Sequence, residues 1–280
     1  MPIRKSYGYL KGPSPLYKTE NILKFRDIFK APPKLPASVD LTKWIPGVLD
    51  QGAEGSCVYN AWALGTQYSQ IRSGGPSWLP SRQFGYWNGR VIQGTTGQDS
   101  GDFIHDAYHQ SRYVGIIPES EWEYLPPDAS GAGGNVLTQP PGSCFTDAAN
   151  EQQHIFAEIE DGDVEAMKMC IAHGFPFEDG FQVPDTFEDP SWNFILDTSS
   201  LTGNFVGGHG TLKMGYDDNF KTNDGPGAFL VPNSWGSDWG LPSLYHPKGF
   251  FMVSYKFIEN TKIESDIWMQ RFLNQQTSLT

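Results

Sequence analysis

The first half of the chain carries apolar positions at helical spacing. After Cys57 the apolar and small side chains recur three and four positions apart, which places them on one face of a helix. Gly74-Gly75 predicts the end of that helix. The same period predicts helices over 81–87 and 103–115, and residues 116–124 are expected to be extended. This half of the chain is therefore predicted to be rich in helices.

The period of the pattern changes after Gly174. Short runs of aromatic and β-branched residues, separated by turn residues, predict strands in this second half. The predicted strands cover 175–183, 205–206, 211–216, 228–232 and 250–255. Residues 35–41 predict one earlier strand, whereas 147–161 and 163–173 are predicted to be helical. Helices followed by strands predict an α+β fold with two lobes.

Two segments lie outside this pattern. Residues 1–34 are punctuated by Gly and Pro, and they predict an arm on the body of the protein with one short helix within 19–30. The arm is too short to form an independent domain. Residues 126–143 contain a run of Gly, Ala and Ser and predict a loop, which is either a flexible connection or a lid.

Composition narrows the possibilities mainly by exclusion. The chain has 280 residues, 38% of them hydrophobic, and a formal net charge of −12. Phosphate contacts need clustered Lys and Arg, so an acidic chain with scattered basic residues is a poor binder of nucleic acid. No apolar run approaches the length of a membrane span, and the N-terminus lacks the apolar core of a secretory signal. We expect a cytoplasmic protein, or one packaged in a viral or other particle.

The three cysteines are too few for a disulfide framework. At most one pair can form, and Cys144 with Cys170 is the pair expected if Cys57 stays free. A reducing compartment fits this count, although one disulfide is compatible with it.

Cys57 is the first candidate for chemistry. It follows a glycine-rich turn and opens a predicted helix, where the macrodipole and unpaired backbone N–H groups favour the nucleophilic thiolate. The Gln51 side-chain amide can donate nearby, so an oxyanion could be held between that amide and the Cys57 backbone N–H. A lone cysteine is more often a small buried hydrophobe. Here that interpretation weakens, because the turn, the amide and the helix start converge.

A base and an orienting group follow in the second half. His209 differs from the other histidines because glycines on both sides allow a close approach by backbone or ligand. It can take the Cys57 proton, while the Asn233 side-chain carbonyl fixes its tautomer and Trp235 shields that hydrogen bond. Taken alone, His209 could equally be a core histidine beside a tight turn.

The remaining histidines carry weaker signals. His105 and His109 have the i, i+4 spacing of metal ligands, but no further His or Cys accompanies them, so a solvated helix face is the favoured interpretation. His154, His173 and His246 lie in polar or turn contexts without companions. The sequence thus predicts no metal site.

The three motifs together resemble the papain-like cysteine peptidases. The match runs from Gln51 to Cys57, then through Gly208-His209 to Asn233-Ser234-Trp235-Gly236, in the family's order and spacing, and it covers about residues 35–268. The resemblance implies a papain-like fold, with a helical lobe packed against a strand-rich, barrel-like lobe. It also implies an active site between the lobes and no metal or organic cofactor.

The resemblance also implies roles for individual residues. Cys57 would be the nucleophile, His209 the acid and base, Asn233 the group that orients His209, and Gln51 part of the oxyanion hole. Gly208 and Trp235 would contact substrate, with Gly208 leaving room for the second residue before the cleaved bond.

The chain departs from the family at three places. Glu54 stands where the family usually has a cysteine, and Val58 where it has an aromatic residue. The first difference removes a disulfide and the second changes packing behind the nucleophile. The family's long helical prosegment is missing, and residues 1–34 are a candidate for a short substitute that inhibits the enzyme by crossing its cleft.

These observations lead to one expected organisation. Residues 1–34 form the arm and 35–280 the peptidase domain, with a helical lobe at about 51–145 and a strand-rich lobe at about 146–262. We expect a cysteine endopeptidase that acts on peptide or protein substrates. The alternatives are an acyl transferase or isopeptidase that uses the same residues, and a catalytically silent binding or structural module.

Overall fold

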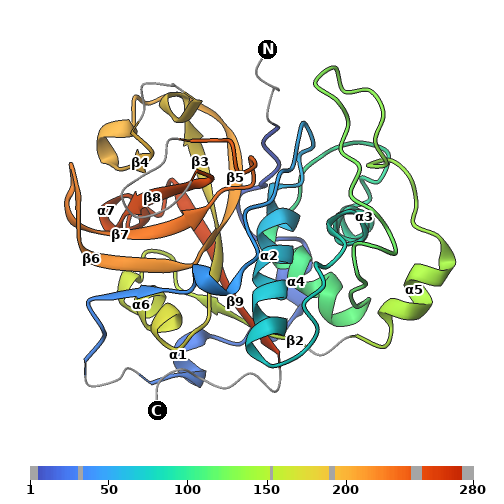
Figure 1. Ribbon diagram of the computed structural model, residues 1–280, viewed down its shortest axis with the longest axis horizontal. Helices are drawn as coiled ribbons and strands as arrows, with labels where there is room; N and C mark the ends of the chain where they lie inside the picture. The colour runs from blue at the N-terminus through green and yellow to red at the C-terminus, as the bar shows by residue number, and fades with distance from the viewer. Residues whose placement is uncertain (1–5, 31–33, 152–153, 189–192, 241–247, 273–280) are drawn as a thin grey trace.

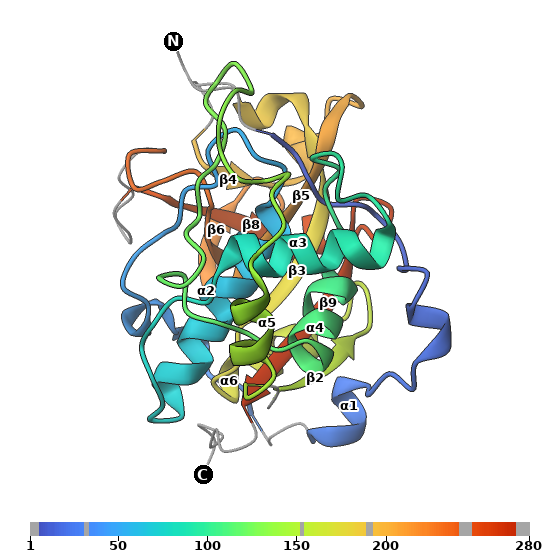
Figure 2. The same cartoon turned by 90° about the vertical axis from the view of Figure 1, so that its right-hand side faces the viewer.

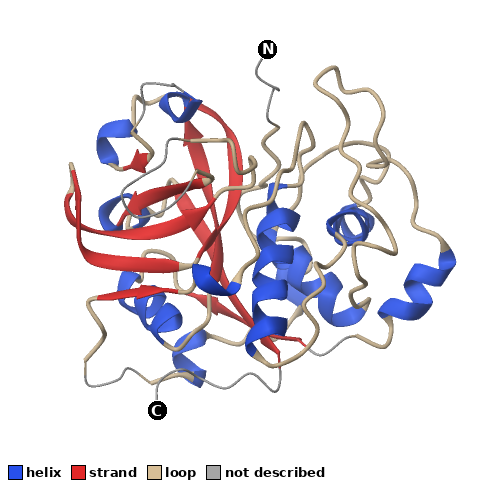
Figure 3. Cartoon of the chain, in the orientation of Figure 1, coloured by secondary structure: helices blue, strands red, loops and turns tan. Residues whose placement is uncertain are grey.

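Helix α2, Cys57–Arg72, stands between a lobe of strands and a lobe of helices (Figure 1). The computed structural model describes residues 6–30, 34–151, 154–188, 193–240 and 248–272. Strands gather on one side of α2, together with some short helices, whereas the other side holds helices and loops without strands (Figure 3). The predicted α+β fold with two lobes is confirmed.

The helices agree largely with the periodicity of the sequence. Those predicted after Cys57, over 81–87, over 103–115 and over 163–173 are all present. Ser81 caps α3 by accepting from Phe84 N, and Asp163 caps α6 by accepting from Ala166 N. The other α-helices are α1 Phe25–Ile28, α3 Arg82–Gln93, α4 Ile104–Tyr113, α5 Gly142–Ala148, α6 Val164–Ala172 and α7 Tyr255–Ile258. Short 3₁₀ helices cover Tyr17–Thr19, Thr42–Trp44, Asp185–Glu188 and Thr198–Ser200.

The strands form two sheets, one of five strands in the order β1-β6-β7-β8-β4 and one of four in the order β2-β9-β3-β5. All neighbouring strands are antiparallel except β4 and β8. The chain passes from one sheet to the other at Met214, between β5 and β6. The strands are β1 Ser38–Asp40, β2 His154–Ile159, β3 Phe177–Pro184, β4 Ile195–Leu196, β5 Phe205–Lys213, β6 Gly215–Thr222, β7 Gly225–Pro232, β8 Phe250–Ser254 and β9 Glu264–Phe272.

The helix predicted over 147–161 is wrong. Helix α5 ends at Ala148, and 154–159 form strand β2, which pairs with β9 along its whole length. The ladder satisfies the backbone groups of β2, so the tertiary contact overrides the local pattern. Strand β9 also pairs with β3, so the strand-bearing part of the chain continues past residue 262, where the predicted lobe ended.

Helix α2 is buried on nearly every side. All its residues from Cys57 through Gln70 are buried, although the sequence pattern indicated one apolar face. One side packs against the strand lobe and the other against α3 and α4. Gly65 lets α2 approach β5 closely, because a Cβ at this position would lie 3.1 Å from Leu212 Cδ1.

The arm contributes to both lobes. Phe25 and Phe29 are buried in the apolar core of the strand lobe, whereas Leu23 is exposed. Of the helix predicted within 19–30, only α1 and the end of a 3₁₀ turn are helical. Figure 2 shows the blue N-terminal segment crossing this side of the molecule on its way to α1.

Within the described chain no helix is both long and apolar enough to cross a membrane.

The contact between α2 and α3 yields a prediction of stability. A Cβ at Gly89 would lie 1.8 Å from the Tyr59 hydroxyl and 1.9 Å from Asp102 Oδ2, and all three are buried. Gly89→Ala should therefore lower the free energy of unfolding by about 1–3 kcal/mol, as overpacking does, measured by urea denaturation. Gly97→Ala is the matched control, because no atom lies within 4 Å of its Cβ. Equal midpoints for the two variants would contradict the tight contact.

Candidate active site

Cys57 is the first residue of α2 and is fully buried. The turn before it reverses at Gly52, whose φ is +60°. Backbone N–H groups of Gly210 and Gly8 donate to its sulfur, and the distance from Gly210 N to Sγ is 3.3 Å. Gly210 follows His209 in β5, so this bond joins the two lobes at the candidate nucleophile. A Cβ at Gly210 would lie 2.9 Å from Val58, which explains why a glycine stands there.

His209 and Asn233 meet as the sequence predicts. His209 Nε2 and Asn233 Oδ1 are 2.8 Å apart, so Nε2 carries the proton and donates to the amide oxygen. His209 Nδ1 is buried and has no hydrogen-bond partner among the described residues. In this tautomer Nδ1 keeps its lone pair and is the ring nitrogen left to take a proton.

Aromatic rings surround the imidazole. The centroids of His209 and Trp235 are 5.4 Å apart, and Phe181 and Phe187 lie within 5.8 and 6.2 Å of the imidazole centroid. Trp235 is itself buried. These rings exclude water from the His209–Asn233 bond, as predicted for Trp235, and this strengthens the bond electrostatically.

Gln51 is fixed at both ends of its amide. Its Oε1 accepts from Ser234 Oγ at 2.6 Å, while Nε2 donates to Glu54 O at 2.8 Å and to Ser6 O at 2.9 Å. Ser234 directly follows Asn233, so the orienting residue and the candidate oxyanion donor are tied together. Of the two carbonyl oxygens that Gln51 binds, that of Ser6 belongs to the arm.

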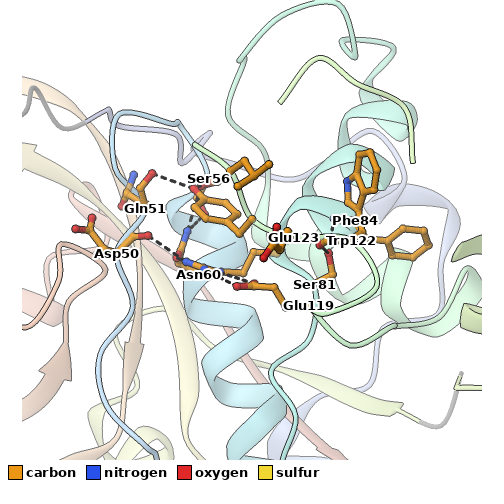
Figure 4. Close-up of polar contacts among 12 residues, drawn as sticks. Asp50, Gln51, Ser56, Asn60, Ser81, Phe84, Glu119, Trp122 and Glu123 are labelled. Atoms are coloured by element: carbon orange, nitrogen blue, oxygen red, sulfur yellow. Dashed lines mark hydrogen bonds and ion pairs between the residues drawn. The ribbon is translucent and has the colours of Figure 1, made fainter. Parts of the chain in front are cut away.

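A hydrogen-bonded scaffold holds the turn between Gln51 and Cys57 (Figure 4). Ser56 Oγ donates to the hydroxyl of Tyr124, which donates in turn to Gln51 O at 2.9 Å. Asn60 Nδ2 donates to Ser56 O, and its Oδ1 accepts from Arg82, whose guanidinium also binds Glu119. Sequence patterns missed these supports, because residues 82, 119 and 124 are distant along the chain.

The arm occupies the site. Ser6 O is bound by Gln51, Gly8 N donates to Cys57, and the ring of Tyr7 lies 6.3 Å from His209 and 6.0 Å from Trp235, centroid to centroid. The sequence offers one hint of these contacts, which is the glycine between two aromatic residues in Tyr7-Gly8-Tyr9. That hint does not identify the partners of these residues, because the partners lie far along the chain.

Backbone pairing carries the arm from one lobe to the other. Asp102 N, in the helical lobe, donates to Gly8 O at 2.7 Å, and Leu10 N donates to Asp102 O at 2.9 Å. Tyr9 N donates to Gly208 O, in β5, at 3.0 Å. The predicted substrate contact Gly208 is thus occupied by the chain's own backbone.

Burial sets the protonation states of Cys57 and His209. It raises the pKa of the Cys57 thiol to about 11, although three backbone N–H groups act in the opposite direction. Burial also lowers the pKa of His209 to about 4, against the Asn233 hydrogen bond, which raises it. With the arm in place, thiol and imidazole are therefore both neutral at pH 7, in contrast to the thiolate expected from the helix terminus alone.

Among the described side chains, the other histidines and cysteines lie in different surroundings. His105 is buried against Trp268 and Glu20, so the prediction of a solvated face is wrong for it, and His109 also contacts Glu20. His246 and the side chain of His154 lie outside the described residues. Within the described ranges, no three His, Cys, Asp or Glu side chains form a group that could hold a metal ion.

No disulfide joins the three cysteines, which are all free and buried. Cys144 lies in a small cluster with Phe84, while Cys170 lies in the core of the strand lobe. Their separation into different cores explains why the pairing considered from the sequence does not occur.

Comparisons with known proteins agree with this architecture. No model of a known protein family matches the chain. The structure is similar to that of xylellain, a cysteine protease from Xylella fastidiosa, with a TM-score of 0.80 and 30% identity over 96% of this chain and 98% of that one. An uncharacterized peptidase C1-like protein of Acanthamoeba polyphaga mimivirus is 27% identical over 95% of this chain and 87% of its own length. Procathepsin B S9 from Trypanosoma congolense shares the fold, with a TM-score of 0.63 and 16% identity over 98% of this chain and 87% of that one.

Glu54, which stands three residues before Cys57, yields a prediction of pH dependence. Burial, reinforced by Asp99, raises the pKa of Glu54 from 4.5 to about 8. Glu54 therefore ionises at a lower pH in the unfolded chain than in the folded one. For this reason its contribution to the free energy of unfolding falls as the pH rises from about 4.5 to about 8. Denaturation midpoints between pH 5 and 8 should show a smaller fall in Glu54→Gln than in the parent chain. Parallel curves for the two proteins would contradict the buried carboxyl.

Proposed function

This chain belongs to the papain-like cysteine peptidase family, and we propose that it is an endopeptidase that hydrolyses peptide bonds through an acyl-enzyme on Cys57. The observation that carries the proposal is the state of the His209 ring. Asn233 binds Nε2 of the ring, and Nδ1 has no hydrogen-bond partner among the described residues. The N–H of the next residue, Gly210, donates to the Cys57 sulfur. These bonds support the assignment of Cys57 as nucleophile, His209 as base and Asn233 as the group that orients the base.

The reaction follows from these positions. His209 Nδ1 takes the thiol proton, and the Cys57 sulfur attacks the substrate carbonyl while the Gln51 amide and the Cys57 N–H stabilise the oxyanion. The C–N bond breaks as His209 returns the proton to the leaving amine. His209 then deprotonates a water molecule, which attacks the thioester carbonyl. The C–S bond breaks and His209 returns that proton to the sulfur, which restores the thiol and the neutral imidazole.

We also propose that the arm inhibits this activity. Ser6 O accepts from the Gln51 amide that would bind the oxyanion, the Gly8 N–H donates to the sulfur, and the Tyr7 ring packs against the imidazole. No substrate carbonyl can reach Cys57 until these residues leave.

We propose further that the protein works in a reducing compartment such as the cytoplasm. The free, buried cysteines support this proposal.

A single substitution should displace the arm. A Cβ at Gly8 would lie 1.6 Å from Gly55 O, so Gly8→Ala cannot keep the bound conformation. We expect iodoacetamide at pH 6 to alkylate Cys57 in Gly8→Ala at least about 10-fold faster than in the parent chain, because a solvated thiol regains its normal reactivity. Peptide mapping identifies the modified cysteine, and hydrolysis of fluorogenic peptides should rise in parallel.

The control for this test is Gly47→Ala, an exposed position with no atom within 4 Å of the added Cβ. Deletion of 1–34 should also raise activity, but it removes Phe25 and Phe29 from the core, so the point substitution is the sharper experiment. Faster alkylation in Gly47→Ala, or equal rates in Gly8→Ala and the parent chain, would refute inhibition by the arm.

The nucleophile is tested in the Gly8→Ala background. Cys57→Ala should lower kcat/KM for a peptide amide by about 10⁴-fold or more, because removing the nucleophile leaves only binding and the oxyanion donors. Urea denaturation checks that the fold is intact. Product analysis with an added amine distinguishes hydrolysis from acyl transfer, and undiminished turnover would overturn the assignment of Cys57.

A further inference from the structure

Tyr9 fills a site that glycines have left open. Its side chain is buried, with only 4% exposed. A Cβ at Gly180 would lie 2.2 Å from the Tyr9 ring, and a Cβ at Gly208 would lie 3.0 Å from it. Any larger residue at either position would close this space. We call the space bounded by Gly180, Gly208, Ser265 and Asp266 the Tyr9 site.

The far end of the Tyr9 site is polar. The Tyr9 hydroxyl donates to Asp266 Oδ2 at 2.5 Å and lies 3.1 Å from Ser265 Oγ. Asp266 has a φ of +59°, a conformation uncommon for residues other than glycine. Its backbone N–H donates to Asp161 Oδ1 at 3.0 Å, which helps to hold the carboxyl in this orientation. The site therefore ends in a placed acceptor and not in an apolar wall.

The Tyr9 site adjoins the nucleophile. The preceding residue, Gly8, donates its N–H to the Cys57 sulfur, and Tyr9 N donates to Gly208 O, next to His209. When the arm leaves, the backbone groups of Gly208 and Asp102 lose these partners. An extended peptide that reaches Cys57 must satisfy the same groups, and so it brings one side chain to the Tyr9 site.

We propose that the Tyr9 site is a specificity pocket that selects substrates presenting a tyrosine side chain, and that Asp266 is its specificity-determining residue. The proposal rests on the proposed peptidase function. Tyrosine is favoured over phenylalanine because the Gly12 N–H, which also donates to Asp266 Oδ2, leaves with the arm. A phenyl ring would then leave the part-buried carboxyl without a hydroxyl donor. It is favoured over arginine because Tyr9 packs in an apolar cluster with Cys57, Val58 and Trp62, where a guanidinium would be costly to desolvate.

The test uses the full chain with Gly8→Ala and Tyr9→Ala, which frees the site of its own occupant. Peptide amides that differ only by Tyr, Phe, Leu or Arg, at each of the two positions before the cleaved bond, are compared by kcat/KM. At one of these positions we expect Tyr to exceed each of the others by about 10-fold. Equal rates for Tyr and Phe at both positions, or a preference for Arg, would overturn the proposal.

Two variants of Asp266 in the same background assign the preference to that residue. Asp266→Gly accepts the positive φ and removes the carboxyl, so the ratio of Tyr to Phe rates should fall toward 1. Asp266→Asn also tolerates this conformation and retains an acceptor, so it should keep most of the preference. A ratio that is unchanged in Asp266→Gly would show that Asp266 does not determine specificity.

A binding experiment separates this inference from the proposed catalysis. A synthetic peptide with the sequence of residues 6–12 is titrated into the same double variant, alongside a peptide carrying Tyr9→Phe. We expect the Phe peptide to have a dissociation constant about 10-fold higher. This result without any hydrolysis would support the pocket and refute the peptidase. Equal dissociation constants, or no binding of either peptide, would refute the pocket even if hydrolysis occurs.

Discussion

The burial of α2 on nearly every side is the constraint on which the rest of the structure depends. A helix covered by strands on one side and by helices on the other cannot rotate or slide without opening a core. Glycines at 65 and 210 let the helix and β5 approach so closely that the Gly210 N–H reaches the Cys57 sulfur. The relative position of nucleophile and base is therefore a consequence of packing, and the polar network around Gln51 only adjusts it.

The same burial controls reactivity. A thiolate–imidazolium pair needs either solvent or fixed dipoles to stabilise its charges. In the arm-bound protein the dipoles are present, since three N–H groups point at the sulfur, yet desolvation outweighs them and both groups stay neutral. Removal of the arm would restore solvent and take away the Gly8 N–H, while the N–H groups of Gly210 and Val58 remain. In our proposal the arm therefore blocks access to the site and also shifts the protonation equilibrium of the residues beneath it.

Local patterns predicted those parts of the structure that local interactions determine. Helical periodicity located α2, α3, α4 and α6. Short motifs indicated Cys57, His209, Asn233 and Gln51 as the candidate site, because glycine-rich turns and a helix start leave traces within a few residues. Strand β2 was missed because its pairing with β9 joins residues more than a hundred positions apart. The path of Tyr9 was missed for the same reason, since Gly180, Gly208 and Asp266 converge on it only in the folded chain.

In the inhibition that we propose, the arm acts as an intramolecular competitor of any substrate. Each of its neutral hydrogen bonds contributes only about 1 kcal/mol net. Covalent attachment nevertheless gives the segment an effective concentration on the order of millimolar. A free peptide that makes equal contacts is at a disadvantage until its own concentration is comparable. An advantage for the substrate must come from contacts that the arm lacks, or from conditions that weaken the arm. Because the Tyr9 hydroxyl is bound by Asp266, we expect the fit of this side chain to affect both the release of the arm and the choice of its replacement.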